Sequence, residues 1–359
     1  MSRAPRASGY FRIDYAEDFA LLQTRRERVA LALFVVVLCG FPFIASAFYL
    51  DLACQVFLAA IGALSLMLLT GFAGQVSLGH AGLLAAGAFT AGILFREFGA
   101  PFWITLPAAA AMGALLGVIF GLPSLRLRGL YLAISTLALY FVVVYVGGEY
   151  ESTRGFSTGI MIDAPKAGAL VLKSPRAWYF ILLVAAVLTL LACANLLRSR
   201  TGRAWRAIRS HEIVAEALGI AVPRYKLLAF VISSALASVA GALFAYYRGF
   251  VSVEAFSLFL SIQYIAMIII GGMGSLLGAL LGALFVTLFP YLIEALLAKL
   301  PNAHSYADAL FAMDYAAFGL VMIIFLLFEP QGLVGIWRRI QNYFLLWPFK
   351  YRPLTGDRK

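Results

Sequence analysis

Long apolar runs separated by short polar breaks dominate the chain. A helix needs about 20 apolar residues to cross the hydrocarbon core of a bilayer. Ten runs approach that length, near residues 29–49, 52–70, 73–95, 101–121, 129–147, 177–197, 227–248, 255–270, 276–298 and 312–328. The pattern predicts an all-α, polytopic membrane protein with about ten transmembrane segments. It leaves open whether the runs at 52–70 and 255–270 are full spans or partial, broken helices.

Two glycine clusters interrupt the apolar runs, one over residues 71–82 and one over residues 271–282. Glycine-interrupted segments in corresponding halves are typical of transporters with internal repeats, in which opened backbone lines the substrate path. Close helix packing through small residues is the alternative, above all for the second cluster. The clusters therefore predict glycine-broken helices and suggest an internal repeat.

The first cluster differs from the second because it also carries polar side chains, those of Gln75, Ser77 and His80. A polar side chain at membrane depth needs a protein partner, water or a ligand. These three residues are therefore candidates for the substrate path, although His80 is equally consistent with a packed, hydrogen-bonded helix residue.

The most strongly basic break is the loop 198–226. Its basic residues are Arg198, Arg200, Arg203, Arg206, Arg209, Arg224 and Lys226, against the acidic residues Glu212 and Glu216. Positive charge beside membrane spans stays in the cytoplasm. Six crossings before this loop and four after it leave both termini cytoplasmic, in agreement with the turn that carries Arg126 and Arg128.

Capping residues predict two short helices inside this loop. Thr201 is a candidate cap for a turn through Ala207, and Ser210 for a helix over residues 211–218 that ends at Gly219. The loop is then either a topology signal alone or a docking element for a cytoplasmic partner.

The domain organisation follows from these breaks. A basic cytoplasmic tail (1–28) precedes a transmembrane domain (29–335), and a second cytoplasmic tail (336–359) follows it. The domain includes the cytoplasmic loop 198–226 and an external loop at 148–176. The external loop is a solvated connector or a contact surface for a soluble external protein.

Composition narrows the function classes. The chain is 63% hydrophobic with a net charge of +11, and its mean hydropathy is +0.93. The basic residues lie in loops and tails, which argues against nucleic-acid binding. The sequence contains neither a P-loop nor a metal-ligand motif, so we expect no catalysis and no cofactor or metal. Within the predicted spans Glu294 is the clearest acidic residue, and this scarcity argues against an ion-coupled carrier.

Five segments together resemble one family, the LivH/LivM membrane permeases of branched-chain amino acid ABC importers. They are residues 71–81, 126–138, 215–220, 271–275 and 329–333, in the order expected for that family. The basic N-terminal extension and the Arg-Leu-Arg-Gly-x-Tyr segment favour the LivM-type half over the LivH-type half.

The resemblance implies a set of partners. A LivH-like second permease would complete the path, two ATP-binding cassette ATPases would hydrolyse ATP, and a periplasmic or lipid-anchored binding protein would deliver the substrate, all at the inner membrane and its lipid. The loop would be the coupling element that contacts an ATPase, through Arg203, Arg206, Glu212, Glu216, Ala217 and Gly219. The usual Ile-x-Leu-Pro ending of that motif is missing.

We expect the substrate path to include Gln75, Ser77, Gly79, His80, Ser135, Thr136, Gly271 and Gly274. For Ser135 and Thr136 the alternative is a hydrogen bond from the hydroxyl back to their own helix. A largely uncharged lining suits a neutral, zwitterionic amino acid. Urea, short amides or another small solute are the alternatives within the family, and an ion-coupled secondary carrier or channel is the alternative outside it.

Overall fold

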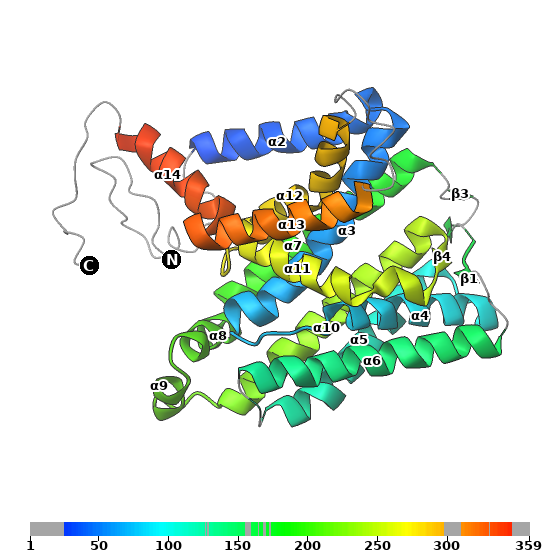
Figure 1. Ribbon diagram of the computed structural model, residues 1–359, viewed down its shortest axis with the longest axis horizontal. Helices are drawn as coiled ribbons and strands as arrows, with labels where there is room; N and C mark the ends of the chain where they lie inside the picture. Colours follow the sequence, from blue (N-terminus) through cyan, green and yellow to red (C-terminus); the bar gives the residue numbers. More distant parts are fainter. Residues whose placement is uncertain are drawn as a thin grey trace.

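The computed structural model describes residues 25–125, 127, 129–154, 159–163, 165–167, 170–171, 174–297, 310–329 and 331–346. Predictions that concern Arg126, Arg128 and the tails at 1–24 and 347–359 lie outside these residues. The described part is a bundle of long helices that run roughly side by side (Figure 1).

Each predicted apolar run forms a helix. Eight helical stretches in the described part are long and apolar enough to cross a membrane. They are α3 (Ala47–Leu66) continued by the π-helix η1 (Met67–Phe72), α4 (His80–Phe98), α5 (Phe102–Ser124), α6 (Leu130–Thr153), α7 (Pro175–Arg198), α10 (Val222–Arg248), the 3₁₀ turn η2 (Val253–Phe256) with α11 (Leu258–Gly271), and α12 (Leu276–Leu297). The other two runs form α2 (Arg25–Ile44) and α13 (Leu310–Phe328), whose described apolar parts, Ala32–Ile44 and Ala316–Phe325, are shorter. A last helix, α14 (Gly332–Leu346), follows.

Several boundaries differ from the sequence prediction. The break predicted at residues 49–52 lies instead at residues 45–46, so α3 begins earlier, at Ala47. Two further helices begin later than predicted. The run predicted from residue 73 begins as a helix only at His80, because the chain between η1 and α4 is extended and turned. The run predicted from residue 255 begins with a 3₁₀ turn, η2 (Val253–Phe256), before α11. In both places the apolar composition extends beyond the helix, so composition alone misplaced its start.

Helix α10 lies in the centre of the bundle and packs closely on α4 and α5. Its contact face is made of small residues. A side chain at Gly241 would overlap the backbone carbonyl of Leu84, and Ser238 Oγ donates a hydrogen bond to Leu83 O at 2.8 Å. On another side, Ser233 Oγ donates to Ser65 O of α3 at 2.7 Å. Small residues let helix backbones approach closely in a membrane, where packing rather than the hydrophobic effect drives association.

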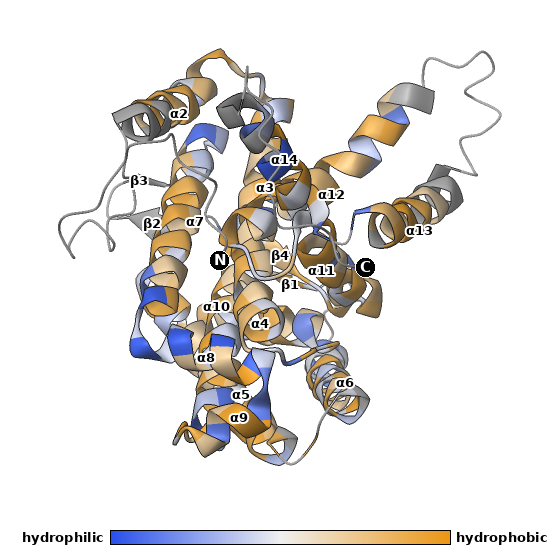
Figure 2. Cartoon of the chain, turned by 90° about the vertical axis from the view of Figure 1, so that its left-hand side faces the viewer, coloured by the Kyte–Doolittle hydropathy of each residue, from blue (hydrophilic) through white to orange (hydrophobic). Residues whose placement is uncertain are grey.

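The two ends of the bundle differ in character. At one end lie the short helices α8 (Arg200–Ser210) and α9 (Glu212–Ala217), where polar residues gather (Figure 2). At the other end lie the short strands β1 (Ile160–Met161) and β4 (Phe250–Val251), which pair antiparallel (Figure 1). Two further strands, β2 (Lys166–Ala167) and β3 (Leu170–Val171), form a hairpin in the segment predicted as the external loop.

Candidate substrate path and coupling site

The first glycine cluster opens the helix between η1 and α4. Gly74 has a φ of +74°, which favours glycine. The opened chain is held on both sides: Thr70 Oγ1 donates to Gln75 O at 2.9 Å, and Gln75 Nε2 donates to Lys226 O at the start of α10 at 3.2 Å. Leu78 N donates to Thr136 Oγ1 at 2.9 Å. The break is therefore a fixed, hydrogen-bonded structure.

Ser77 and His80 are almost completely buried, with exposed fractions of 1% and 0%. His80 Nε2 donates to Gly62 O in α3 at 3.0 Å, and its ring packs edge-on against Tyr264, with 4.9 Å between centroids. Neither Ser77 Oγ nor His80 Nδ1 has a hydrogen-bond partner among the described residues. Buried polar atoms without protein partners are candidates for contact with water or a ligand.

Of four other predicted path residues, Gly79, Gly271 and Thr136 contact backbone directly. A side chain at Gly79 would overlap the carbonyl carbon of Thr136, so the opened chain touches α6 directly. Gly271 packs against the carbonyl of Gly278 at the turn between α11 and α12. Ser135 is half-buried and Thr136 is buried, where Thr136 Oγ1 also donates to Ala133 O at 2.8 Å. All of these positions favour small residues or short hydroxyls.

The second glycine cluster forms the turn between α11 and α12, where Gly272 has a φ of +113° and Gly274 a φ of +85°. This turn lies beside the first break: Gly274 N donates to Met67 Sδ of η1 at 3.3 Å. Two segments 200 residues apart in the sequence thus meet at the same end of the bundle.

Arg209 of α8 joins the two breaks. Its Nη1 donates a hydrogen bond to the carbonyl of Gly71, and its Cγ lies 3.2 Å from the place where a side chain at Gly74 would begin. A side chain at Gly274 would begin 2.6 Å from the same Nη1 atom. In the sequence Arg209 is one of the loop's seven positive charges, and nothing there distinguishes it from its neighbours.

Helices α8 and α9 form the short helix pair that the sequence predicted, although their caps differ. Ser210 does not cap α9: it is the last residue of α8, where its Oγ donates to Arg206 O at 2.9 Å, and His211 precedes α9 instead. Thr201 lies inside α8. Gly219 follows α9 with a φ of +84°, as predicted for a helix stop.

The helix pair α8 and α9, called the α8–α9 hairpin below, is anchored to the rest of the bundle. Trp205 is fully buried and its Nε1 donates to Tyr225 O at 2.8 Å. Lys226 Nζ pairs with Glu212 Oε1 at 2.8 Å. Arg203 and Arg206 cap the preceding turn through the carbonyls of residues 198 and 197, at 2.9 and 3.0 Å. Helix α8 is therefore hydrogen-bonded to both α7 and α10, and α9 is paired with α10.

The far side of α9 is open. Glu216, Ala217 and Gly219 are exposed, and so are two large apolar side chains, Ile213 at 73% and Leu218 at 76%. Exposed apolar side chains on a polar loop are characteristic of a surface that contacts another protein.

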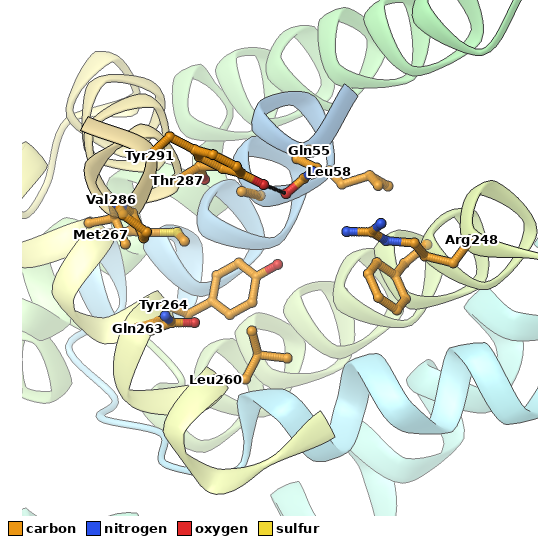
Figure 3. Close-up of a pocket in the computed structure, with 13 residues that line it drawn as sticks. Gln55, Leu58, Arg248, Leu260, Gln263, Tyr264, Met267, Val286, Thr287 and Tyr291 are labelled. Atoms are coloured by element: carbon orange, nitrogen blue, oxygen red, sulfur yellow. Dashed lines mark hydrogen bonds between the residues drawn. The ribbon is translucent and has the colours of Figure 1, made fainter. Parts of the chain in front are cut away.

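A cavity of about 280 Å³ lies between α3, α10, α11 and α12 (Figure 3). Gln55, Arg248, Gln263, Tyr264 and Tyr291 supply polar groups to it, and the remaining lining is largely apolar. None of these residues was predicted from the sequence as part of a site. Among the described residues, no group of three or more His, Cys, Asp or Glu side chains is placed to hold a metal ion.

Comparison with known proteins shows the family to which the chain belongs. A family model described as "Branched-chain amino acid transport system / permease component" matches residues 48–326. The chain belongs to this permease family. The resemblance inferred from the five sequence segments is therefore confirmed, and the protein is a multi-pass permease of the inner membrane. Membership implies an ABC importer with a LivH-like partner permease.

Individual relatives support the LivM type. The permease is 32% identical over 340 residues to the high-affinity branched-chain amino acid transport system permease protein LivM of Escherichia coli. This match covers 88% of the chain and 76% of the relative. It is 35% identical over 277 residues to LivM of Salmonella typhimurium, or 70% of this chain and 65% of that relative. A probable LivH permease of Methanocaldococcus jannaschii is 26% identical over 71% of this chain and 82% of its own length. No solved structure matches the permease.

Proposed function

We propose that this permease is the LivM-type membrane half of an ATP-driven importer for branched-chain amino acids. The observation that carries the proposal is the contact between the α8–α9 hairpin and both helix breaks through Arg209. An importer needs an element that transmits movement of its ATPases to the helices around the substrate. A rigid hairpin that touches two opened helices meets this need, whereas a loop that served only as a topology signal would not require it.

In this proposal the exposed side of α9 docks on an ATPase subunit. Ile213 and Leu218 supply an apolar contact, and Glu216 and Gly219 occupy the positions that the family motif gives to acidic and glycine residues. A second ATPase would bind the LivH-like partner. The hairpin end and both termini are then cytoplasmic, and the end with β1 and β4 faces the external binding protein.

Gln75, Ser77 and His80 keep their proposed place on the substrate path, with Ser135 and Thr136 beside them. Their support is burial together with the unpartnered atoms Ser77 Oγ and His80 Nδ1. Gly79, Gly271 and Gly274 supply in this proposal the close backbone packing of the two breaks. The domain boundaries at residues 28, 198, 226 and 335 follow from the same topology.

Co-purification tests the proposal directly. The full chain is tagged and extracted from its native membranes, and its partners are identified. We expect ATP-binding subunits and a second permease with the wild type, and loss of the ATPases alone from an Ile213→Glu, Leu218→Glu variant. Arg200→Glu is the matched control, because it changes charge on the exposed surface of α8 without touching α9.

ATP dependence of uptake supplies the second readout. Proteoliposomes that contain the purified complex and its binding protein should accumulate radiolabelled L-leucine only with internal ATP. A wild-type chain that purifies alone, or uptake that follows an ion gradient without ATP, would refute the importer assignment.

A further inference from the structure

The cavity between α3, α10, α11 and α12 contains polar groups that the described protein leaves without partners. Tyr264 is 94% buried, since its exposed fraction is 6%, and its hydroxyl points into the cavity (Figure 3). Thr287 Oγ1 is buried and has no hydrogen-bond partner among the described residues. Unpaired polar groups at membrane depth are costly and mark substrate pathways.

Arg248 supplies a positive charge at the same cavity. It is the last residue of α10, and its guanidinium lies 5.9 Å from the ring centroids of both Phe244 and Tyr247. Figure 3 shows this guanidinium and the Tyr264 hydroxyl directed into the cavity from opposite sides. None of the ion pairs among the described residues includes Arg248.

Asp51 lies behind the cavity wall and is hydrogen-bonded to two neighbours. Asp51 accepts hydrogen bonds from the Tyr247 hydroxyl and from Gln55 Nε2, the latter at 2.7 Å. Gln55 Oε1 in turn accepts from the Tyr291 hydroxyl at 3.3 Å. Gln55 and Tyr291 bring this chain of bonds to the cavity wall. Since none of the ion pairs among the described residues includes Arg248, its guanidinium remains available to an anion.

We propose that this cavity is the binding site for the zwitterionic head of the transported amino acid, with Arg248 receiving its carboxylate. The proposal rests on the proposed function and names the site at which it acts. The guanidinium forms two parallel hydrogen bonds with a carboxylate, a geometry that lysine cannot provide. The ammonium group of the substrate meets oxygen acceptors across the cavity, the Tyr264 hydroxyl and the Gln263 amide.

The rest of the lining suits an aliphatic side chain. Leu58, Leu260, Met267 and Val286 contribute apolar surface from three different helices. One charged end and one apolar end fix the orientation of a small amphiphilic molecule, as is usual in small-molecule sites. Urea offers neither a carboxylate nor an aliphatic group, so the lining favours a branched-chain amino acid over that alternative.

The predicted path residue His80 takes a defined role in this site. It does not line the cavity, but its ring packs on Tyr264 and its Nε2 is fixed by Gly62 O. A side chain at Gly62 would begin 2.5 Å from Cε1 of Tyr264, so glycine is what makes room for this ring. His80 and Gly62 are therefore positioning residues that hold the Tyr264 hydroxyl in the cavity.

The test uses the complete importer, with its partner permease, ATPases and binding protein, in proteoliposomes. The variant Arg248→Gln removes the charge and keeps much of the side-chain length. Loss of a charge-assisted hydrogen-bond pair predicts at least about a tenfold fall in L-leucine uptake. The ATPase rate stimulated by the loaded binding protein should remain near that of the wild type, since Arg248 is far from α8 and α9.

Controls separate the site from general effects of charge and folding. Arg176→Gln removes an exposed positive charge near the start of α7, away from the cavity, and should leave uptake unchanged. Tyr264→Phe removes one hydroxyl and should lower uptake severalfold while the complex assembles normally. Arg248→Lys keeps the charge and should restore part of the lost uptake.

The outcomes distinguish the two proposals. ATP-driven leucine uptake that is equal in the wild type and in Arg248→Gln overturns the site and leaves the proposed function intact. No ATP-driven leucine uptake by the wild-type complex overturns the proposed function, and the site falls with it. A parallel fall of uptake and ATPase rate in Arg248→Gln would show damage to assembly, and would also contradict the site.

Discussion

The hydrogen bond from Arg209 to Gly71 makes a quantitative prediction about coupling. Arg209→Gln removes the guanidinium that bridges the two helix breaks. A hydrogen bond from a charged donor contributes about 1.5–3 kcal/mol. Because Arg209 remains exposed over more than a third of its surface, we take the lower end, about 1.5 kcal/mol, which corresponds to roughly a tenfold change in an equilibrium between two arrangements.

The expected result is uncoupling. Without the bridge, the hairpin still docks on its ATPase through the exposed face of α9, so ATP hydrolysis continues. Its movement no longer reaches the breaks at Gly71 and Gly274, so leucine uptake per ATP hydrolysed should fall about tenfold. Both rates are measured on the same proteoliposomes.

Arg200→Gln is the matched control for Arg209→Gln. Arg200 lies on the same helix and is exposed, but no hydrogen bond among the described residues joins it to either break. We expect its ratio of uptake to hydrolysis to stay near that of the wild type. An unchanged ratio in Arg209→Gln, or an equal fall in both variants, would refute the role given to the bridge.

Two further predictions concern packing. Gly241→Ala should lower the unfolding midpoint in detergent, because the new methyl group overlaps the Leu84 carbonyl and overpacking costs about 1–3 kcal/mol or more. Gly319→Ala is the control: nothing lies within 4 Å of the place where its side chain would begin. We expect this variant to be neutral or to raise the free energy of unfolding by up to about 1 kcal/mol. Trp205→Phe removes the hydrogen bond to Tyr225 O and part of a buried ring, at about 1–3 kcal/mol. Trypsin should then cleave at the arginines of α8 faster than in the wild type, and equal cleavage rates would contradict the anchoring role.

The sequence predicted the features that depend on local chemistry. Apolar runs marked the helices, and glycines marked the places where φ is positive, at Gly74, Gly219 and Gly274. It misplaced the start of α9, because the hydroxyl of Ser210 bonds back to a carbonyl of its own helix, a competitor to capping that sequence does not resolve.

The cavity could not be predicted because its lining combines α3 with three helices, α10, α11 and α12, that follow more than 150 residues later in the sequence. Periodicity reports that a helix face is buried and does not report what it faces. One signal was nevertheless available: Arg248 ends a span on the side assigned to the exterior, where the positive-inside rule disfavours arginine. A positive residue against that rule is a reasonable candidate for an anion site.

The cavity is lined in part by α3 and α11, and Arg209 contacts the segments that follow these same two helices. This arrangement leads to a final prediction. Tyr264 and the break at Gly272 are eight residues apart on α11 and its turn, so about 12 Å separates them. If α11 moves as a rigid element, the arrangement of the break and the occupancy of the cavity depend on the same equilibrium between two positions of α11. The double variant Arg209→Gln, Arg248→Gln should then lose less uptake than the product of the two single losses. Independent sites more than about 10 Å apart give multiplicative effects, so a multiplicative loss would show that the bridge and the cavity act separately.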